Sequence, residues 1–198
     1  MNNFIKYLII SILFIFIYLN IFNVENTEKY NESIVKERNE KHEYFKNSNE
    51  SPFFEKKFKK LNYFDPDISF KVIAKIEYLK KKDTVLLKTS DNNEAIYIKF
   101  ARAVMKLKNE NLNLILYKEA MNENEIFLLF NDLTNGNETY EGGRYIDFDF
   151  KNSKRIEIDF NKAYNPYCVY DIKYSCPIPP KENKIPLRIL AGEKKYFN

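Results

Sequence analysis

The order of apolar and polar residues divides the chain into three parts. Residues 4–24 form an almost wholly apolar run, and Lys6 is its single charge. Residues 25–50 are polar with interspersed charges, and residues 51–198 place apolar side chains at changing intervals. We therefore expect a membrane-anchor helix at 1–24, a charged helical stalk at 25–50 and one folded domain at 51–198, since about 150 residues suit a single domain.

The apolar run is long enough for a transmembrane helix, because about 20 helical residues cross a hydrocarbon core of ~30 Å. A cleaved signal peptide is the alternative, but the residues after Leu19 lack the small-residue pattern of a cleavage site. We favour an uncleaved, single-pass signal-anchor. Lys6 precedes the run and Glu25 and Glu28 follow it. This bias predicts a domain on the periplasmic or extracellular side of the cell envelope.

Helical signals continue after the apolar run. Glu–Lys pairs four residues apart in 32–41 support a helix, and Ile34 and Phe45 fall on one of its faces. We expect this stalk to be exposed and to pack loosely. Ser51 followed by Pro52 predicts the start of a second, short helix.

From residue 70 onward the apolar residues alternate with polar ones, which is typical of half-buried strands. Residues 126–130 are apolar on both faces and predict a central strand, and 108–111 predict a hairpin turn. We also expect a hairpin between the last two strands. About eight strands favour a mostly β fold, as one barrel-like or two-sheet domain with a few short helices. The expected strands are 70–78, 85–89, 95–100, 104–107, 112–116, 126–130, 146–150 and 156–160.

Special backbone residues gather near the C-terminus. The four Gly of the chain are at 136, 142, 143 and 192, and five of the seven Pro lie between 166 and 186. Both residue types shape tight loops, and loops on a rigid scaffold often carry binding sites. Arg144 follows two Gly and suits a carboxylate or phosphate ligand. The candidate ligand-binding residues of 130–194 are Asp132, Thr134, Glu138, Tyr140, Arg144, Asp159, Asn161, Tyr164, Asn165, Glu182, Asn183, Glu193 and Lys194.

Charge and motifs argue against several function classes. The net charge is +4, and the short Lys clusters are mixed with acidic residues, so we expect no nucleic-acid partner. The only His is His42 in the stalk, which leaves no Ser-His or Cys-His pair for nucleophilic catalysis. The string GNETYEGG lacks the Gly-Lys-Ser/Thr ending of a phosphate-binding loop. We expect neither a metal nor a cofactor.

Cys168 and Cys176 are the two cysteines of the chain. In an exported protein, such a pair suggests a disulfide. The alternative is two small buried thiols, because sequence spacing does not determine the Cα separation that a disulfide requires.

Four strings in this region resemble one known family. They are FNDLTNGNETYEGGRYID at 130–147, DFNKAYNPYC at 159–168, CPIPPKEN at 176–183 and AGEKKY at 191–196. They are similar to the bacterial domain-of-unknown-function family 1684, over about residues 50–196. The resemblance implies no activity, cofactor or catalytic residue. It does imply that relatives are often exported or lipid-anchored, and here the apolar helix would replace the lipid.

Three hypotheses for function remain open. The first is a membrane-anchored binding module that holds a small polar or anionic ligand or a peptide in the 130–194 loops, with Arg144 as its anchor. The second is a cofactor-independent hydrolase or lyase that uses carboxylates with Tyr140 or Tyr164. The third is a structural or assembly factor of the cell envelope, which applies if Arg144, Asp159 and Glu193 are each buried and fully satisfied by hydrogen bonds to the backbone.

Overall fold

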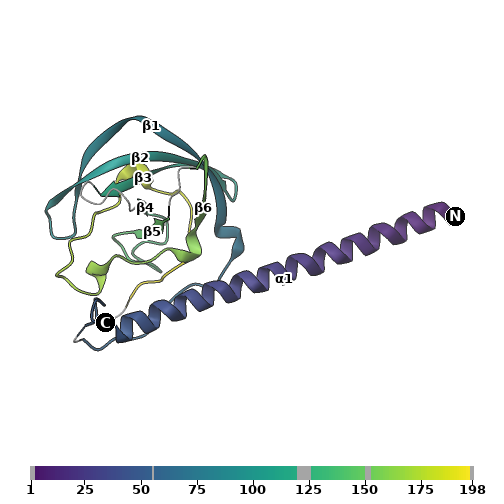
Figure 1. Ribbon diagram of the computed structural model, residues 1–198, viewed down its shortest axis with the longest axis horizontal. Helices are drawn as coiled ribbons and strands as arrows, with labels where there is room; N and C mark the ends of the chain where they lie inside the picture. Colours follow the sequence, from purple (N-terminus) through teal and green to yellow (C-terminus); the bar gives the residue numbers. More distant parts are fainter. Residues whose placement is uncertain (1–2, 55, 120–125, 150–152, 197–198) are drawn as a thin grey trace.

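The computed structural model describes residues 3–54, 56–119, 126–149 and 153–196, without the side chains of residues 3, 4, 6, 17–23 and 80–82 (Figure 1). It contains one long helix and six strands, together with four short 3₁₀ turns. The elements are α1 (Asn3–Asn47), η1 (Ile68–Phe70), β1 (Lys71–Lys88), β2 (Glu94–Leu107), β3 (Glu110–Glu119), β4 (Ile126–Phe130), β5 (Arg144–Phe148), β6 (Arg155–Asp159), η2 (Phe160–Lys162), η3 (Tyr167–Val169) and η4 (Lys181–Asn183).

The strands form one antiparallel sheet in the order β5-β4-β3-β2-β1-β6. The sheet curls into a half-barrel around the C-terminal loops (Figure 1). The mostly β fold with few helices is therefore confirmed.

Both faces of the middle of the sheet are buried. Leu114 and Leu116 of β3 belong to the main hydrophobic core, while Ile115 and Tyr117 belong to a second cluster with Leu129. Successive residues of a strand point to opposite faces, so β3 contributes to both clusters. β4 lies between β3 and β5 and is buried on both sides, as its continuous apolar sequence predicted.

Two pairs of expected strands are each a single long strand. β1 covers both 70–78 and 85–89 except for Phe70 and Thr89 at the two ends, and its pairing with β2 shifts register between Tyr78 and Asp83. β2 likewise covers 95–100 and 104–107. A bulge adds a residue to one strand and bends it without ending it, which breaks the alternation on which the predicted boundaries rested. The predicted hairpin turn joins β2 to β3, and Lys108 has a φ of 55° there.

The predicted hairpin between the last two strands is wrong. β5 pairs with β4, and β6 pairs with β1, at opposite ends of the strand order. Residues 150–152, which belong to the expected hairpin, lie outside the described residues. Alternation predicts that a segment is a strand, but it does not select the partner strand.

The predicted stalk is helical, and it continues from the N-terminal segment as one helix, α1. Its second half packs more closely than we expected. Ile34 and Phe45 are each 2% exposed, and Arg38 donates through Nη1 to the carbonyl of Phe64 at 2.8 Å. The N-terminal part of α1 projects away from the sheet (Figure 1).

The short helix predicted at Ser51 is absent, and turns and irregular backbone take its place in the described residues 51–63. Ser51 donates through Oγ to the carbonyl of Phe45 at 2.7 Å and accepts from the N–H of Phe53 at 3.0 Å, which turns the chain after α1. Phe53 and Leu61 then bury their side chains with Phe45 and Tyr170 in an aromatic cluster. Burial of these side chains favours the irregular path over a helix.

The predicted transmembrane helix is not confirmed. Within the part of the chain that the structure describes, no helix is both long enough and apolar enough to cross a membrane. The side chains of residues 4, 6 and 17–23, which belong to the apolar run, are not among those described.

Candidate functional site

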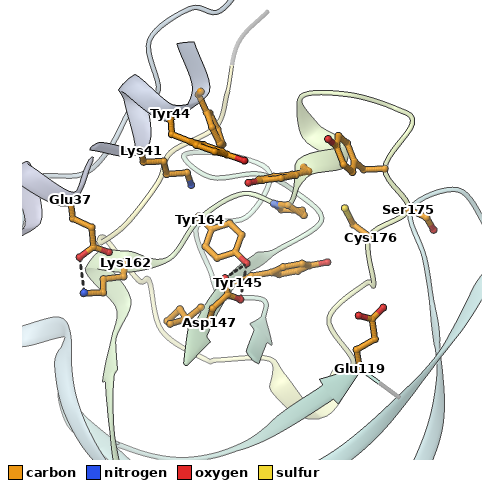
Figure 2. Close-up of a pocket in the computed structure, with 15 residues that line it drawn as sticks. Glu37, Lys41, Tyr44, Glu119, Tyr145, Asp147, Lys162, Tyr164, Ser175 and Cys176 are labelled. Atoms are coloured by element: carbon orange, nitrogen blue, oxygen red, sulfur yellow. Dashed lines mark hydrogen bonds and ion pairs between the residues drawn. The ribbon is translucent and has the colours of Figure 1, made fainter. Parts of the chain in front are cut away.

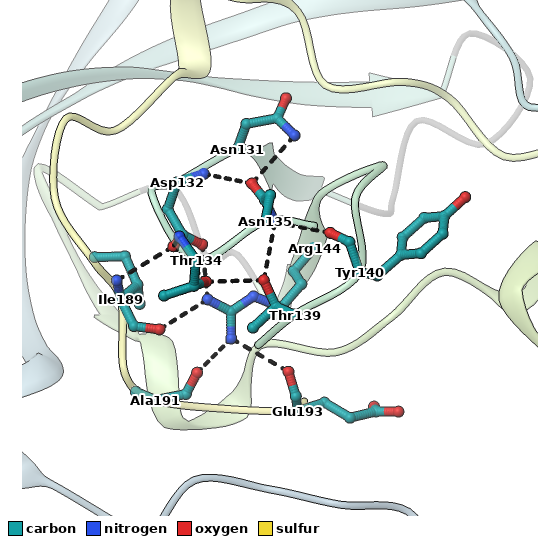
Figure 3. Close-up of polar contacts among 10 residues, drawn as sticks. All are labelled: Asn131, Asp132, Thr134, Asn135, Thr139, Tyr140, Arg144, Ile189, Ala191 and Glu193. Carbon is teal, nitrogen blue, oxygen red and sulfur yellow. Dashed lines mark hydrogen bonds and ion pairs between the residues drawn. The ribbon is translucent and has the colours of Figure 1, made fainter. Parts of the chain in front are cut away.

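Arg144, the first residue of β5, is completely buried (Figure 3). Its Nη2 donates to Asp132 Oδ2 at 2.8 Å and to the carbonyl of Ile189 at 2.9 Å. Its Nη1 donates to the carbonyls of Ala191 and Glu193. Burial lowers the pKa of Arg144, and the charge of Asp132 opposes that shift. The guanidinium therefore ties β5 to the C-terminal segment, and its charge is paired inside the protein.

The turn before β5 is closed by its own polar side chains (Figure 3). Asp132 Oδ1 accepts from the N–H of Thr134 at 2.7 Å and from its hydroxyl at 2.5 Å. The hydroxyls of Thr134 and Thr139 lie 2.8 Å apart, and Asn135 Nδ2 donates to the carbonyl of Tyr140 at 2.8 Å. These short-range bonds replace a regular backbone ladder and fix the loop.

Two of the glycines allow very close backbone contacts. Gly143 has a φ of +91°, and a Cβ there would lie 2.6 Å from the carbonyl oxygen of Phe130 and 2.6 Å from Pro179 Cγ. Gly192 has a φ of +78°, with the carbonyl oxygen of Ala163 at 2.6 Å from such a Cβ. The expectation of tight loops is confirmed at these positions.

Glu193 is the acidic partner of a second buried group. It is 1% exposed and accepts from Lys41 Nζ of α1 at 3.1 Å, from Asn165 Nδ2 at 3.0 Å and from the hydroxyl of Tyr170. Burial, and then the charge of Glu193, raises the pKa of Tyr170 well above its ordinary value. This carboxylate connects α1 to two separate loops.

Asp159 and Asn161 form a third group at the end of β6. Asp159 Oδ1 caps η2 by accepting from the N–H of Asn161 at 3.0 Å, and Oδ2 accepts from the hydroxyl of Tyr30 on α1 at 2.9 Å. Asn161 in turn bonds both backbone groups of Asp67, at 2.9 and 2.8 Å. Both side chains are buried and hold α1 and the start of β1 in place.

Asn183 joins the two strands where their backbone pairing is short. In the described part of the chain, β3 pairs with β4 at Tyr117 and Lys118 alone. Asn183 is fully buried, accepts from the N–H of Ile115 at 2.7 Å and donates to the carbonyls of Ile115 and Leu129 at 2.8 Å each. Its neighbour Glu182 accepts from the hydroxyl of Tyr117. The amide thus completes the hydrogen bonding that the backbone ladder leaves open.

A cavity of about 920 Å³ lies between the end of α1, β5 and the loops after η2 (Figure 2). Its walls combine aromatic and polar side chains. The ring centroids of Tyr167 and Tyr174 lie 5.2 Å apart in an edge-to-face arrangement. The aromatic residues of the lining are Tyr44, Phe45, Tyr145, Tyr164, Tyr167 and Tyr174.

The cations of the cavity wall are neutralised by carboxylates. Lys162 Nζ lies 2.6 Å from Glu37 Oε2 (Figure 2). Lys41 pairs with the buried carboxylate of Glu193. The hydroxyl of Tyr164 donates to both oxygens of Asp147, at 2.8 and 2.7 Å. Burial raises the pKa of Tyr164, and the charge of Asp147 raises it further. The cavity therefore presents phenols and carboxylates more than unpaired positive charge.

The predicted site residues do not converge on this cavity. Its lining in the described part of the chain includes one of them, Tyr164, which with Asn161 also borders a smaller cavity of about 100 Å³. The others belong to the buried groups above or to isolated contacts. Glu138 forms an ion pair with Arg188 at the surface, and the ammonium of Lys194 lies 4.8 Å from the ring centroid of Phe64. Tyr140 is half-buried.

Sequence reasoning missed most of the cavity wall. Tyr145, Tyr167 and Tyr174 fall within the loop-rich stretch, so a search for aromatic residues there would have found them. Tyr44 lies on α1, and no local pattern places it opposite Tyr167.

The two cysteines are neighbours with free thiols. Cys168 lies in η3, and its N–H donates to Cys176 Sγ at 3.3 Å. The disulfide stays a prediction.

The fold and the cavity define a mostly β chain whose half-barrel sheet supports an aromatic pocket beside a helix. The chain belongs to the family described as a protein of unknown function, DUF1684, whose profile matches residues 56–194. This confirms the family resemblance, while a bacterial origin is not shown. The chain is also similar to the uncharacterised protein of gene locus rrnAC0354 of Haloarcula marismortui, known from a solution NMR structure. The two share 32% identity with a TM-score of 0.65, over 86% of this chain and 96% of the other. A search of curated proteins finds no match.

Proposed function

We propose that the chain is a binding module that holds a small polar ligand in the tyrosine-lined cavity. The observation that carries this proposal is the cavity itself. Its volume of about 920 Å³ and its mixed aromatic and polar wall are those of a small-molecule site. Tyrosine supports such binding, because its ring offers apolar contact area and its hydroxyl offers a hydrogen bond.

The charges of the wall favour a ligand that donates hydrogen bonds, such as an amine or a polyol. Lys162 and Lys41 are already paired with carboxylates, at 2.6 and 3.1 Å. Glu119 and Asp147 add two acceptors to the lining. A positive or hydroxyl-rich group could be held by these carboxylates and by the faces of the tyrosine rings.

The anionic ligand expected at Arg144 has less support. That side chain is completely buried and already bonds Asp132 and three backbone carbonyls. Binding an anion there would require breaking a buried ion pair, which is costly. The ligand site is therefore better assigned to the cavity.

The test is a ligand-observed NMR screen of the full chain with small amines, polyols and carboxylic acids. Binding is expected from the first two classes. Asp147→Asn should weaken binding about tenfold or more, because it removes a charged acceptor. The matched control is Glu157→Gln, which changes an exposed carboxylate on β6 in the same way and should leave binding unchanged. Equal binding by both variants, or no ligand from any class, would contradict the proposal.

We also propose that the projecting part of α1 attaches the chain to a membrane, with the domain on the periplasmic or extracellular side. The supporting observation is a set of exposed apolar side chains on this part of the helix: Ile9 is 53%, Leu13 56% and Phe14 67% exposed. Exposed apolar surface of this kind is typical of membrane or protein contacts.

Flotation of the full chain with phosphatidylcholine vesicles tests the attachment. The chain should float with the vesicles, and the double variant Ile9→Glu/Leu13→Glu should stay at the bottom of the gradient. Val35→Glu is the matched control, since it adds a charge to an exposed position of the same helix beside the domain. A wild-type chain that does not float would refute the attachment.

A further inference from the structure

Cys168 and Cys176 lie next to each other because the segment between them folds back on itself. The N–H of Cys168 donates to Cys176 Sγ at 3.3 Å, which brings the second sulfur against the first residue. Ser90 anchors this arrangement from outside the loop. Its N–H donates to the carbonyl of Cys176 at 2.9 Å, and its Oγ accepts from the N–H of Cys176 at 3.1 Å. The two thiols are thus held together by a segment far away in the sequence.

The surroundings make the two sulfurs chemically unequal. The hydrogen bond between the thiols lowers the pKa of Cys168 to about 6 against the opposing effect of burial, and hydrogen bonds from Ser90 and Tyr140 add to the lowering. The same thiol–thiol bond, together with burial, raises the pKa of Cys176. Tyr145 is a further titratable group near both sulfurs, and the cysteine charges contribute to raising its pKa.

The two cysteines also differ in their exposure to solvent. Cys168 is half-buried, whereas Cys176 is 9% exposed and lies at the wall of the aromatic cavity (Figure 2). The cysteine with the lowered pKa is thus also the more exposed residue of the two. The second sulfur lies where it can attack the first once the first has reacted.

We propose that Cys168 and Cys176 form a redox-active dithiol, with Cys168 as the attacking thiolate and Cys176 as the resolving thiol, whose oxidants are small organic disulfides. The Cys168 thiolate attacks one sulfur of the disulfide, forms a mixed disulfide and releases one thiolate. Cys176 then loses its proton and attacks Cys168 Sγ. The Cys168–Cys176 bond forms, and the second thiolate leaves. The protein gives up two electrons and two protons, and the disulfide becomes two thiols.

This activity can be tested separately from the ligand proposed for the cavity. Its first step depends on Cys168 and Tyr140, which are not part of the cavity lining, whereas the resolving thiol of Cys176 is part of it. Asp147→Asn should weaken amine or polyol binding without changing the oxidation of the dithiol, and Cys168→Ala should prevent that oxidation without changing the binding.

The first test is alkylation of the reduced, full chain by iodoacetamide, followed by peptide mass spectrometry at several pH values. The alkylation rate of Cys168 should change less than about twofold between pH 7 and 8, whereas an ordinary thiol gains about eightfold. Cys176→Ala removes the hydrogen-bonding partner and should restore a steep rise with pH. An ordinary pH profile for Cys168 in the wild-type chain would overturn the assignment of the attacking thiolate.

The second test exposes the reduced chain to glutathione disulfide. The wild-type chain should lose two hydrogen atoms and carry no glutathione, while Cys176→Ala should retain a glutathione adduct on Cys168. Cys168→Ala should react slowly at pH 7. Circular dichroism of each variant establishes that it is folded. A wild-type chain that stays reduced, or that keeps a stable adduct, would refute the dithiol.

Discussion

The Arg144 cluster and the tyrosine-lined cavity both include residues of β5, but the first is closed to solvent and the second is open. The cluster gathers a cation, an acid and backbone carbonyls with no solvent access. The cavity gathers six aromatic side chains around about 920 Å³ of open space. In this chain, the concentration of polar residues that the sequence shows belongs to loops fixed by internal hydrogen bonds. The ligand-sized cavity is lined instead by tyrosines that no sequence motif distinguishes.

The difference matters for the choice among the hypotheses. Arg144, Asp159 and Glu193 are all buried, as a structural role requires. The condition set for that role is met only in part, because Arg144 Nε has no hydrogen-bond partner among the described residues. Glu193 is moreover bonded chiefly by side chains rather than by backbone groups. The three residues can hold the loops that form the cavity wall, since Glu193 connects Lys41 to Asn165. A locked scaffold and an open pocket therefore belong to one arrangement.

The largest effect should come from breaking the cluster. Arg144→Met should lower the free energy of unfolding by about 3–5 kcal/mol, because the carboxylate of Asp132 is left buried and unpaired. The matched control is Arg188→Met, which removes a surface ion pair with Glu138 and should cost less than about 1 kcal/mol. Urea unfolding of both variants measures the difference.

The double variant Arg144→Met/Asp132→Asn sharpens this result. It removes both charges, so it should be more stable than Arg144→Met alone. If Arg144→Met unfolds like the wild-type chain but loses ligand binding, then the guanidinium is part of a binding site and the comparison fails.

Glycine substitutions give a smaller effect with an internal control. Gly143→Ala should cost about 2–4 kcal/mol, since the new Cβ combines a φ of +91° with a contact of 2.6 Å to the carbonyl oxygen of Phe130. Gly136→Ala has a similar φ of +83° but meets nothing within 4 Å, so it should cost only about 1–2 kcal/mol. Equal losses in thermal or urea unfolding would show that the close contact relaxes freely.

The same residues show how far sequence reasoning reaches. Gly143 and Arg144 could be identified as special from the scarcity of Gly and the small number of Arg. The burial of Arg144 could not be identified, because it depends on the carbonyls of Ile189 and Ala191, which lie far along the chain. The cavity has the same origin, since Tyr44 on α1 meets Tyr167 only after the helix docks through Phe45.

The sequence predicted correctly those features of the fold that depend on local residue patterns. It did not predict the features that depend on which strands pair with each other. Alternation identified the strands, and the apolar run at 126–130 identified a strand buried on both faces. The register shift near Tyr78 and the separation of β5 from β6 are features of the pairing between strands. Neither leaves a mark within a short window of sequence.

The smallest changes in unfolding free energy are expected from removing a single tyrosine hydroxyl, either beside Glu193 or at the cavity wall. Tyr170→Phe removes a buried hydroxyl that donates to the carboxylate of Glu193, and it should cost about 1.5–3 kcal/mol. Tyr164→Phe removes a hydroxyl that donates to the exposed Asp147 at the cavity wall, and it should cost about 1 kcal/mol or less. Urea unfolding at pH 7 compares the two variants.

Alkaline pH then tests the environment of each phenol. Folding raises the pKa of both tyrosines well above 10.0, chiefly through burial. Such a group contributes stability that is fully present below the unfolded pKa of about 10 and is lost as pH rises toward the folded pKa, by up to ~1.4 kcal/mol per pH unit. The wild-type chain should therefore lose stability above pH 10 more steeply than either variant. Each variant should reduce the slope by a similar amount, because burial raises the pKa of both phenols well above that of the unfolded chain. Parallel curves for the wild-type chain and Tyr170→Phe would mean that this phenol ionises as freely in the folded protein as in the unfolded chain, which would contradict its enclosure beside Glu193.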